Sequence, residues 1–163
     1  MTGVGRVAFA ALVMALTGVA CVVEERPDRA AAESDQGAPS VEIITPNGVA
    51  SMPVFSPAVR VGDLLFLSGA IGTIGEELRL IEGGVGPETR QTLRNIERVL
   101  GAAGATMTGV VKCTVFLADI ADYAAMNEVY LEFFPSDPPA RSAMAGSGLA
   151  LGARVEIECI AAV

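Results

Sequence analysis

The chain has 163 residues, about half of them hydrophobic, and a formal net charge of −8. This length suffices for one ordinary domain with an appendage, and the acidic balance disfavours a nucleic-acid-binding protein, which would need a basic face. The chain contains no histidine, which excludes Ser-His-Asp and Cys-His catalysis and most zinc sites.

Residues 1–20 have the composition of an export signal. One early charge precedes an apolar run over residues 7–20, which is short for a membrane span and typical of a signal-peptide core. The triplet "GVA" before Cys21 is typical of a bacterial lipoprotein cleavage box, although Gly18 stands where Leu is usual, and it also suits an ordinary signal peptidase. We therefore expect an exported, periplasmic protein with cleavage before Cys21 and a lipid tether on that cysteine. The alternative is an uncleaved membrane anchor.

Residues 21–40, "CVVEERPDRAAAESDQGAPS", are polar and acidic, with few large apolar side chains. Such a segment cannot bury enough surface to offset the entropy lost on ordering, so we expect a flexible tether. The folded domain is then residues 41–163. Its cysteines, Cys113 and Cys159, lie in apolar strand-like runs. Export permits a disulfide, but the sequence cannot show whether the two residues face each other, and we expect two buried free thiols.

The domain opens with strand-like segments. "VEIIT" at 41–45 predicts a strand that ends at the turn signal "PNG". Residues 52–72 predict an extended arm followed by a strand at 64–68. The prolines Pro53 and Pro57 keep the arm out of the centre of a sheet.

Two amphipathic helices are predicted next. The first begins at Gly86, with Pro87 in its first turn, and ends near Gly101. The second follows a β-branched strand at 110–117 and is capped by Asp119. Each helix presents one apolar face to a core. The apolar positions are Leu93, Ile96, Val99, Leu100 and Ala103 in the first helix and Tyr123, Met126, Tyr130, Phe133 and Phe134 in the second.

A last strand is predicted from Arg154 to Ala162. The whole order is strand, strand, helix, strand, helix, strand, strand. Helices that follow strands, with enough residues for crossovers, predict an α+β fold: a mixed sheet with two helices on one face. The other face needs a cover, which in a chain this short is most simply another subunit.

Two glutamates on the last strand form one candidate site. Alternate residues of a strand share a face, so Val155 and Ile157 would face the helices, while Glu156 and Glu158 would share the opposite face. If that face is buried, each carboxylate needs a partner or a raised pKa. The alternative is a solvated edge strand with two ordinary glutamates.

Two further polar residues stand in unusual places. Asn127 lies midway along the apolar stripe of the second helix, between Tyr123 and Tyr130. Its amide is either satisfied by the backbone or faces a pocket. Arg141 follows two prolines in a loop that enters a strand. Its guanidinium is either a surface charge or a planar, bidentate binder of a carboxylate.

Four stretches together resemble the Rid/YjgF family of small enamine and imine deaminases. They are "VGDLLFLSGAIG", "QTLRNIERVLGAAGATMTGVVKCTVFLADIADYAAMNEVYLEFF", "PPARSAM" and "VEIECIAAV". The resemblance covers the chain from about Asn47 to Val163. It implies a chorismate-mutase-like α+β fold, a homotrimer, and active sites in the clefts between subunits. It also implies hydrolysis of 2-imino acids to 2-oxo acids and ammonia without a metal or a cofactor.

The resemblance also implies roles for individual residues. The arginine of the family's "P-A-R-S" motif, which binds the substrate carboxylate, falls on Arg141. The glutamate that positions the attacking water falls on Glu156. The remaining positions of the family's pocket fall on Phe55, Ser68, Gly69 and Asn127.

Some positions depart from the family's pattern. Ala70 stands where the family usually has Gln, Phe55 where it has Tyr, and Ala143 where several members have Cys. The first hypothesis is therefore an exported imine hydrolase. The second is a non-catalytic module on the same trimeric scaffold that binds small carboxylates or carbonyl compounds. The third is a purely structural lipoprotein.

Overall fold

The computed structural model describes residues 39–49, 52–75 and 78–163. The predicted signal peptide, Cys21 and nearly all of the predicted tether lie outside these residues. No helix in the described ranges is long and apolar enough to cross a membrane.

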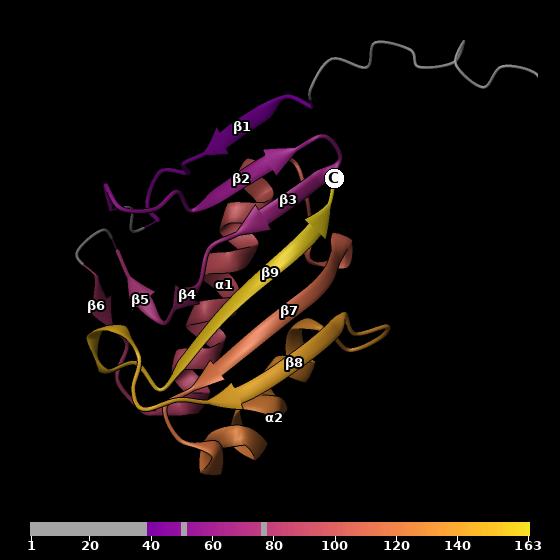
Figure 1. The fold of residues 1–163 in the computed structure, drawn as a ribbon. Helices are drawn as coiled ribbons and strands as arrows, with labels where there is room; N and C mark the ends of the chain where they lie inside the picture. Colours follow the sequence, from indigo (N-terminus) through magenta and orange to yellow (C-terminus); the bar gives the residue numbers. More distant parts are fainter. Residues whose placement is uncertain (1–38, 50–51, 76–77) are drawn as a thin grey trace, which may run out of the picture. The chain divides into compact units, whose positions relative to one another are not determined.

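The main sheet is mixed, as predicted. Across it lie, in this order, β1 (Val41–Ile44), β2 (Ala58–Val61), β3 (Leu64–Leu67), β9 (Val155–Ala162), β7 (Val110–Leu117) and β8 (Ala140–Ala145) (Figure 1). Neighbouring strands are antiparallel except β7 and β8, which are parallel. The short β4 (Ala70–Ile71) also pairs with β9, and β5 (Thr73–Ile74) pairs with β6 (Arg79–Leu80) in a separate ribbon.

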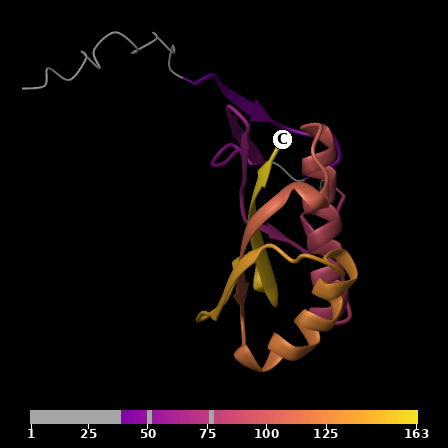
Figure 2. The same cartoon turned by 90° about the vertical axis from the view of Figure 1, so that its right-hand side faces the viewer.

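Both helices lie on one face of this sheet, which confirms the predicted architecture (Figure 2). They are α1 (Val85–Ala102) and α2 (Tyr123–Phe133), and three 3₁₀ turns lie at Met107–Gly109, Ile120–Asp122 and Ala150–Gly152. The core fills the space between helices and sheet. Its largest fully buried side chains include Leu65, Leu93, Ile96, Leu100, Leu117, Met126 and Ile157.

Three local predictions were wrong. The predicted arm contains β2, because Pro57 precedes the strand and removes no ladder hydrogen bond, while Gly62, with φ at 58°, closes a β2–β3 hairpin. Asp119 caps the 3₁₀ turn rather than α2, since its Oδ1 accepts from the N–H of Ala121 at 2.9 Å. Arg141 lies within β8 rather than in a loop.

The expectation of two free thiols was also wrong. Cys113 on β7 and Cys159 on β9 are directly paired residues of the antiparallel ladder, with Cα atoms 4.1 Å apart, and their sulfurs form a disulfide. Both side chains therefore point to the same face, and both are buried. The sequence alone could not supply the register that brings them together.

The alternation predicted for β9 is confirmed, because Val155, Ile157, Cys159 and Ala161 are buried while the intervening residues are not. The intervening residues belong to the sheet face that carries no helix (Figure 2). This open face is largely apolar. Its exposed or half-buried apolar side chains are Val41, Ile43, Val59, Val61, Leu64, Phe66, Phe116, Met144 and Ile160.

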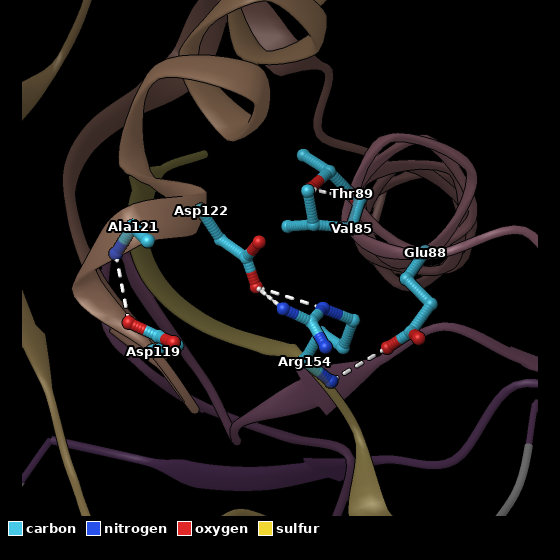
Figure 3. Close-up of polar contacts among 7 residues, drawn as sticks. All are labelled: Val85, Glu88, Thr89, Asp119, Ala121, Asp122 and Arg154. Carbon is cyan, nitrogen blue, oxygen red and sulfur yellow. Dashed lines mark hydrogen bonds and ion pairs between the residues drawn. The ribbon is translucent and has the colours of Figure 1, made fainter.

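A polar cluster fixes the start of β9 (Figure 3). The backbone N–H of Arg154 donates to the buried Glu88 of α1 at 2.7 Å. The Arg154 guanidinium donates to Asp122 through Nε at 2.8 Å and forms an ion pair with it through a terminal nitrogen at 2.6 Å. Arg154, two residues before Glu156, therefore joins the start of β9 to α1 and to Asp122, the residue directly before Tyr123 of α2.

Candidate functional site

Arg141 points toward the helix-covered side of the sheet. In the parallel β7–β8 ladder it is paired with the buried Cys113, and paired residues share a face. Because β8 is the edge strand, the side chain reaches α2, where its terminal nitrogen donates to the hydroxyl of Tyr123 at 3.0 Å. The guanidinium carbon also lies over the ring of Tyr130, 4.7 Å from its centroid. These contacts hold the cation in one orientation.

Polar atoms without partners lie on α2, the helix that Arg141 contacts. In the described part of the chain, the Asn127 Oδ1 and the Tyr130 hydroxyl are buried and have no hydrogen-bond partner. Burial raises the pKa of Tyr130 to about 12, although the charge of Arg141 acts in the opposite direction. The pKa of Tyr123 is lowered, first by its hydrogen bond with Asn127 and then by Arg141. Buried groups without partners are rare in folded proteins, and here they indicate a place for a ligand.

Glu156 lies in a second group, beside an irregular part of the β3–β4 edge. Phe66 pairs with Ile160 and Ala70 with Ile157, so three residues oppose two, as in a β-bulge. Gly69 lies in this bulge, and a Cβ atom there would collide with the Glu156 carboxylate. Glycine is therefore the residue that lets the carboxylate sit against the backbone.

The neighbouring serine is part of the same bulge. The Ser68 hydroxyl donates to the carbonyl of Ser56 at 2.7 Å, and the Ser68 N–H donates to the carbonyl of Pro57 at 3.0 Å.

Burial, and secondarily the nearby Glu158, raise the pKa of Glu156. A carboxylate with a raised pKa is a stronger base once it is ionised, which suits proton transfer.

A cavity of about 560 Å³ opens beside Glu156. Four predicted site residues line it, namely Phe55, Ser68, Gly69 and Glu156, and Ala70 does so as well. The two departures from the family's pattern at Phe55 and Ala70 therefore both face this cavity. Arg141 and Asn127 are not among its lining residues.

The predicted site residues thus form two groups rather than one. Arg141 is paired with Cys113 on the helix-covered face, whereas Glu156 is paired with Phe116 on the open face. Successive residues of a strand point to opposite faces of a sheet. Arg141 and Glu156 of one chain therefore do not face a common space.

The described residues hold no group of three or more cysteine, aspartate or glutamate residues that could bind a metal ion. The chemistry that they offer is a fixed guanidinium with free polar neighbours and a desolvated carboxylate at an apolar cavity. Such groups can bind a carboxylate and accept a proton.

Comparison with known proteins places the chain among relatives of the same kind. Residues 45–163 match the family described as Endoribonuclease L-PSP, known also as Rid or YjgF. The chain belongs to this family. The Rid relatives include the chloroplastic Reactive Intermediate Deaminase A of Arabidopsis thaliana, 40% identical over 73% of this chain and 64% of the plant protein. They also include the 2-iminobutanoate/2-iminopropanoate deaminase of Capra hircus, 44% identical over 73% of this chain and 87% of the relative.

Solved structures show the Rid fold as well. The E. coli protein TdcF, crystallised with bound serine, superimposes with a TM-score of 0.69 at 30% identity. The match covers 75% of this chain and 98% of that one. The predicted chorismate-mutase-like α+β fold of a Rid/YjgF protein is thereby confirmed.

Sequence reasoning missed two residues of the arginine group. It placed Tyr123 and Tyr130 on the apolar face of the second helix, but Tyr123 is 39% exposed and binds Arg141, and Tyr130 stacks under it. The spacing around Asn127 was a usable signal, because residues three and four apart on a helix are neighbours. What the sequence lacked was the β7–β8 register that brings Arg141 to them.

Proposed function

We propose that this Rid protein hydrolyses 2-imino acids to 2-oxo acids and ammonia. The names of its relatives from Arabidopsis and goat support this reaction class. The observation that carries the proposal in this chain is the Arg141 group, in which the guanidinium contacts Tyr123 and Tyr130 of α2, the helix that also carries two buried polar atoms without partners. A bound carboxylate would satisfy the guanidinium in a planar, bidentate way. The serine bound to the TdcF relative is a small amino acid with a carboxylate group.

We further propose that each site is assembled from two copies of the chain in a homotrimer. Arg141 and Glu156 point to opposite faces of their own sheet, so a ligand that contacts both must take them from different copies. The open apolar face supplies a reason for association, since an exposed patch of this kind is typical of an interface. Glu156 lies on that face, where a neighbour's edge strand β8 would bring its Arg141.

In the proposed reaction, Arg141 holds the carboxylate and places the imine carbon near a water molecule bound to Glu156. Glu156 accepts a proton from the water as the water oxygen bonds to the imine carbon, and it passes this proton to the imine nitrogen. The resulting aminoalcohol expels ammonia, and its hydroxyl becomes the carbonyl of the 2-oxo acid. The Asn127 Oδ1, an acceptor without a partner, is suited to the N–H of the imine. Positioning and one proton transfer are the contributions required of the protein.

The direct test follows 2-iminobutanoate, generated in the assay, and measures the release of ammonia and 2-oxobutanoate above the spontaneous rate. Arg141→Ala should lower kcat/KM by about 10- to 100-fold, the value of a charge-assisted hydrogen-bond pair. Arg141→Lys should restore only part of it, because an ammonium cannot bind in a bidentate way. If Arg141→Ala releases product as fast as the wild type, the carboxylate-binding role is wrong.

The second candidate is a non-catalytic module that binds small carboxylates or carbonyl compounds. It is favoured by Phe55 and Ala70 in the cavity, which offer no polar group to a reacting substrate, and by the predicted export. Calorimetry with 2-oxobutanoate separates the two candidates, because the module would bind this compound and leave the imine's decay unchanged. RNA cleavage, which the family description suggests, is disfavoured by the net charge of −8.

A further inference from the structure

The cavity beside Glu156 is larger than a short-chain imino acid requires. Its volume of about 560 Å³ lies within the range of about 300–1000 Å³ that holds drug-sized ligands. It extends from Gly69 and Glu156 to the buried side of α1, where Ile96 and Val99 form its wall. The cavity therefore has an outer part at Gly69 and Glu156 and an inner part at Ile96 and Val99.

The inner wall offers almost nothing polar to a ligand. The amide of Asn95 already donates to the carbonyls of Ile71 at 3.1 Å and Thr73 at 2.9 Å, and it accepts from Gln91 at 2.9 Å. Most of the other lining residues are apolar, among them Val49, Met52, Leu67, Ile71, Leu78 and Leu151. Such a wall favours the apolar part of a ligand.

The charges of the lining residues determine which part of a substrate enters the cavity. No lining residue is basic, and Glu156 is the one acidic residue among them. A carboxylate inside the cavity would lose its hydration without a cationic partner and would be repelled by Glu156. The substrate carboxylate must therefore stay outside, where the proposed site supplies Arg141, and the substrate side chain must point inward.

We propose that the preferred substrates are 2-imino acids with large apolar side chains, branched, thioether or aromatic, which fill this cavity while Glu156 activates water at its entrance. This inference rests on the proposed imine hydrolysis and adds the substrate class. One methylene group in an apolar pocket changes kcat/KM by about 10- to 200-fold. The leucine-derived imine should therefore exceed the alanine-derived imine in kcat/KM by at least about 10-fold.

The experiment compares imines generated by an amino-acid oxidase from alanine, 2-aminobutyrate, leucine, methionine and phenylalanine. The decay of each imine is followed with and without the full-length protein. Val99→Phe places a ring in the inner cavity and should lower the ratio of the leucine rate to the alanine rate by about 10-fold. Because Val99 is only 5% exposed, Ala150→Phe, at an exposed lining position, provides a second variant that spares the core.

Leu131→Phe is the matched control, since it adds the same ring on the exposed side of α2, where Leu131 is 59% exposed. It should leave the ratio unchanged. Acceleration of the small imines alone, or a ratio that neither Val99→Phe nor Ala150→Phe alters, would overturn the role of the cavity and leave imine hydrolysis standing. Acceleration of no imine at all would overturn both.

Discussion

The hydroxyl oxygen of Tyr123 accepts a hydrogen bond from a terminal nitrogen of the Arg141 guanidinium at 3.0 Å. Without it, Arg141 would keep its charge and its contact with Tyr130 but lose the hydrogen bond that sets its orientation. We expect Tyr123→Phe to raise KM for a 2-imino acid by about 10-fold, with a smaller change in kcat, because ligand binding then has to order the arginine.

Tyr130→Phe is the companion variant for this measurement, because it tests the second hydroxyl of the arginine group. It keeps the ring under Arg141 and removes a hydroxyl that has no partner in the described structure. If Tyr123→Phe and Tyr130→Phe give the same KM as the wild type, neither hydroxyl positions the arginine or the substrate.

Glu158 affects the acidity of its neighbour on the open face. Burial raises the pKa of Glu156, and the charge of Glu158 raises it further. A base acts in its ionised form, so activity should fall as the pH drops through a pKa above the usual glutamate value. Glu158→Gln removes one cause of the raised pKa of Glu156, so the acid limb of the kcat/KM profile should move to lower pH. The shift should be less than about one unit, because Glu156 and Glu158 are both partly exposed.

Glu42→Gln is the control for that profile, because Glu42 is an exposed glutamate of the edge strand β1. It should leave the acid limb in place. A limb that does not move in Glu158→Gln, or that moves equally in both variants, would exclude Glu156 as the group that titrates.

At the residue scale, the sequence and its family resemblance named Arg141, Asn127 and Glu156 as candidates, but they did not name Tyr123 and Tyr130 or predict that the candidates form two groups. Strand alternation correctly placed Glu156 opposite the core-facing Val155 and Ile157. It could not place Arg141, because this requires the parallel register of β8 against β7. The sequence predicted Asn127 as an amide that is either satisfied or faces a pocket, and its unpartnered Oδ1 favours the pocket.

At the element scale, strong periodicity gave accurate bounds. The strand predicted at 110–117 is β7, Val110–Leu117, and the helix predicted from Gly86 begins at Val85. The β2 strand was missed because prolines near an extended run suggest an arm outside the sheet. Both prolines, Pro53 and Pro57, lie before the first residue of β2. Pairing partners distant in the sequence, including the disulfide, depend on tertiary register and could not be derived from local pattern.

The Cys113–Cys159 disulfide links β7 to β9. β7 pairs with β8, the strand that carries Arg141, and β9 carries Glu156. It closes a loop with a sequence separation of 46 residues, and the chain-entropy relation gives about 4 kcal/mol for such a loop. We expect the double variant Cys113→Ala and Cys159→Ala to lose up to that free energy of unfolding, measured by denaturant titration at fixed protein concentration.

The same titration with a reductant separates the bond from the packing of the side chains. Reduced wild type should lose stability, and the double variant should not respond. If reductant leaves the wild type unchanged, the disulfide does not contribute to stability. A disulfide is also the form that an oxidising compartment maintains, and this agrees with the predicted export.

At the scale of the whole molecule, one chain contains both groups of the proposed site but does not bring them together. The helix-covered face packs against the core, and the open face carries Glu156 and Glu158 among exposed apolar side chains such as Ile43 and Phe66. Arg141 lies at the outer edge of the sheet, on β8. This arrangement favours a closed ring of copies, in which each edge meets the next open face.

The most direct test of this account mixes two impaired variants, Arg141→Ala and Glu156→Gln, by unfolding them together and refolding. Each chain then carries the group that the other lacks. If sites form between copies in a homotrimer, a random equal mixture should regain about a quarter of the wild-type imine hydrolysis, because one cleft in four receives both groups. Refolding Arg141→Ala with the double variant Arg141→Ala and Glu156→Gln should restore none. A mixture of the two single variants that forms trimers but hydrolyses the imine no faster than the two variants refolded separately would contradict a site shared between copies.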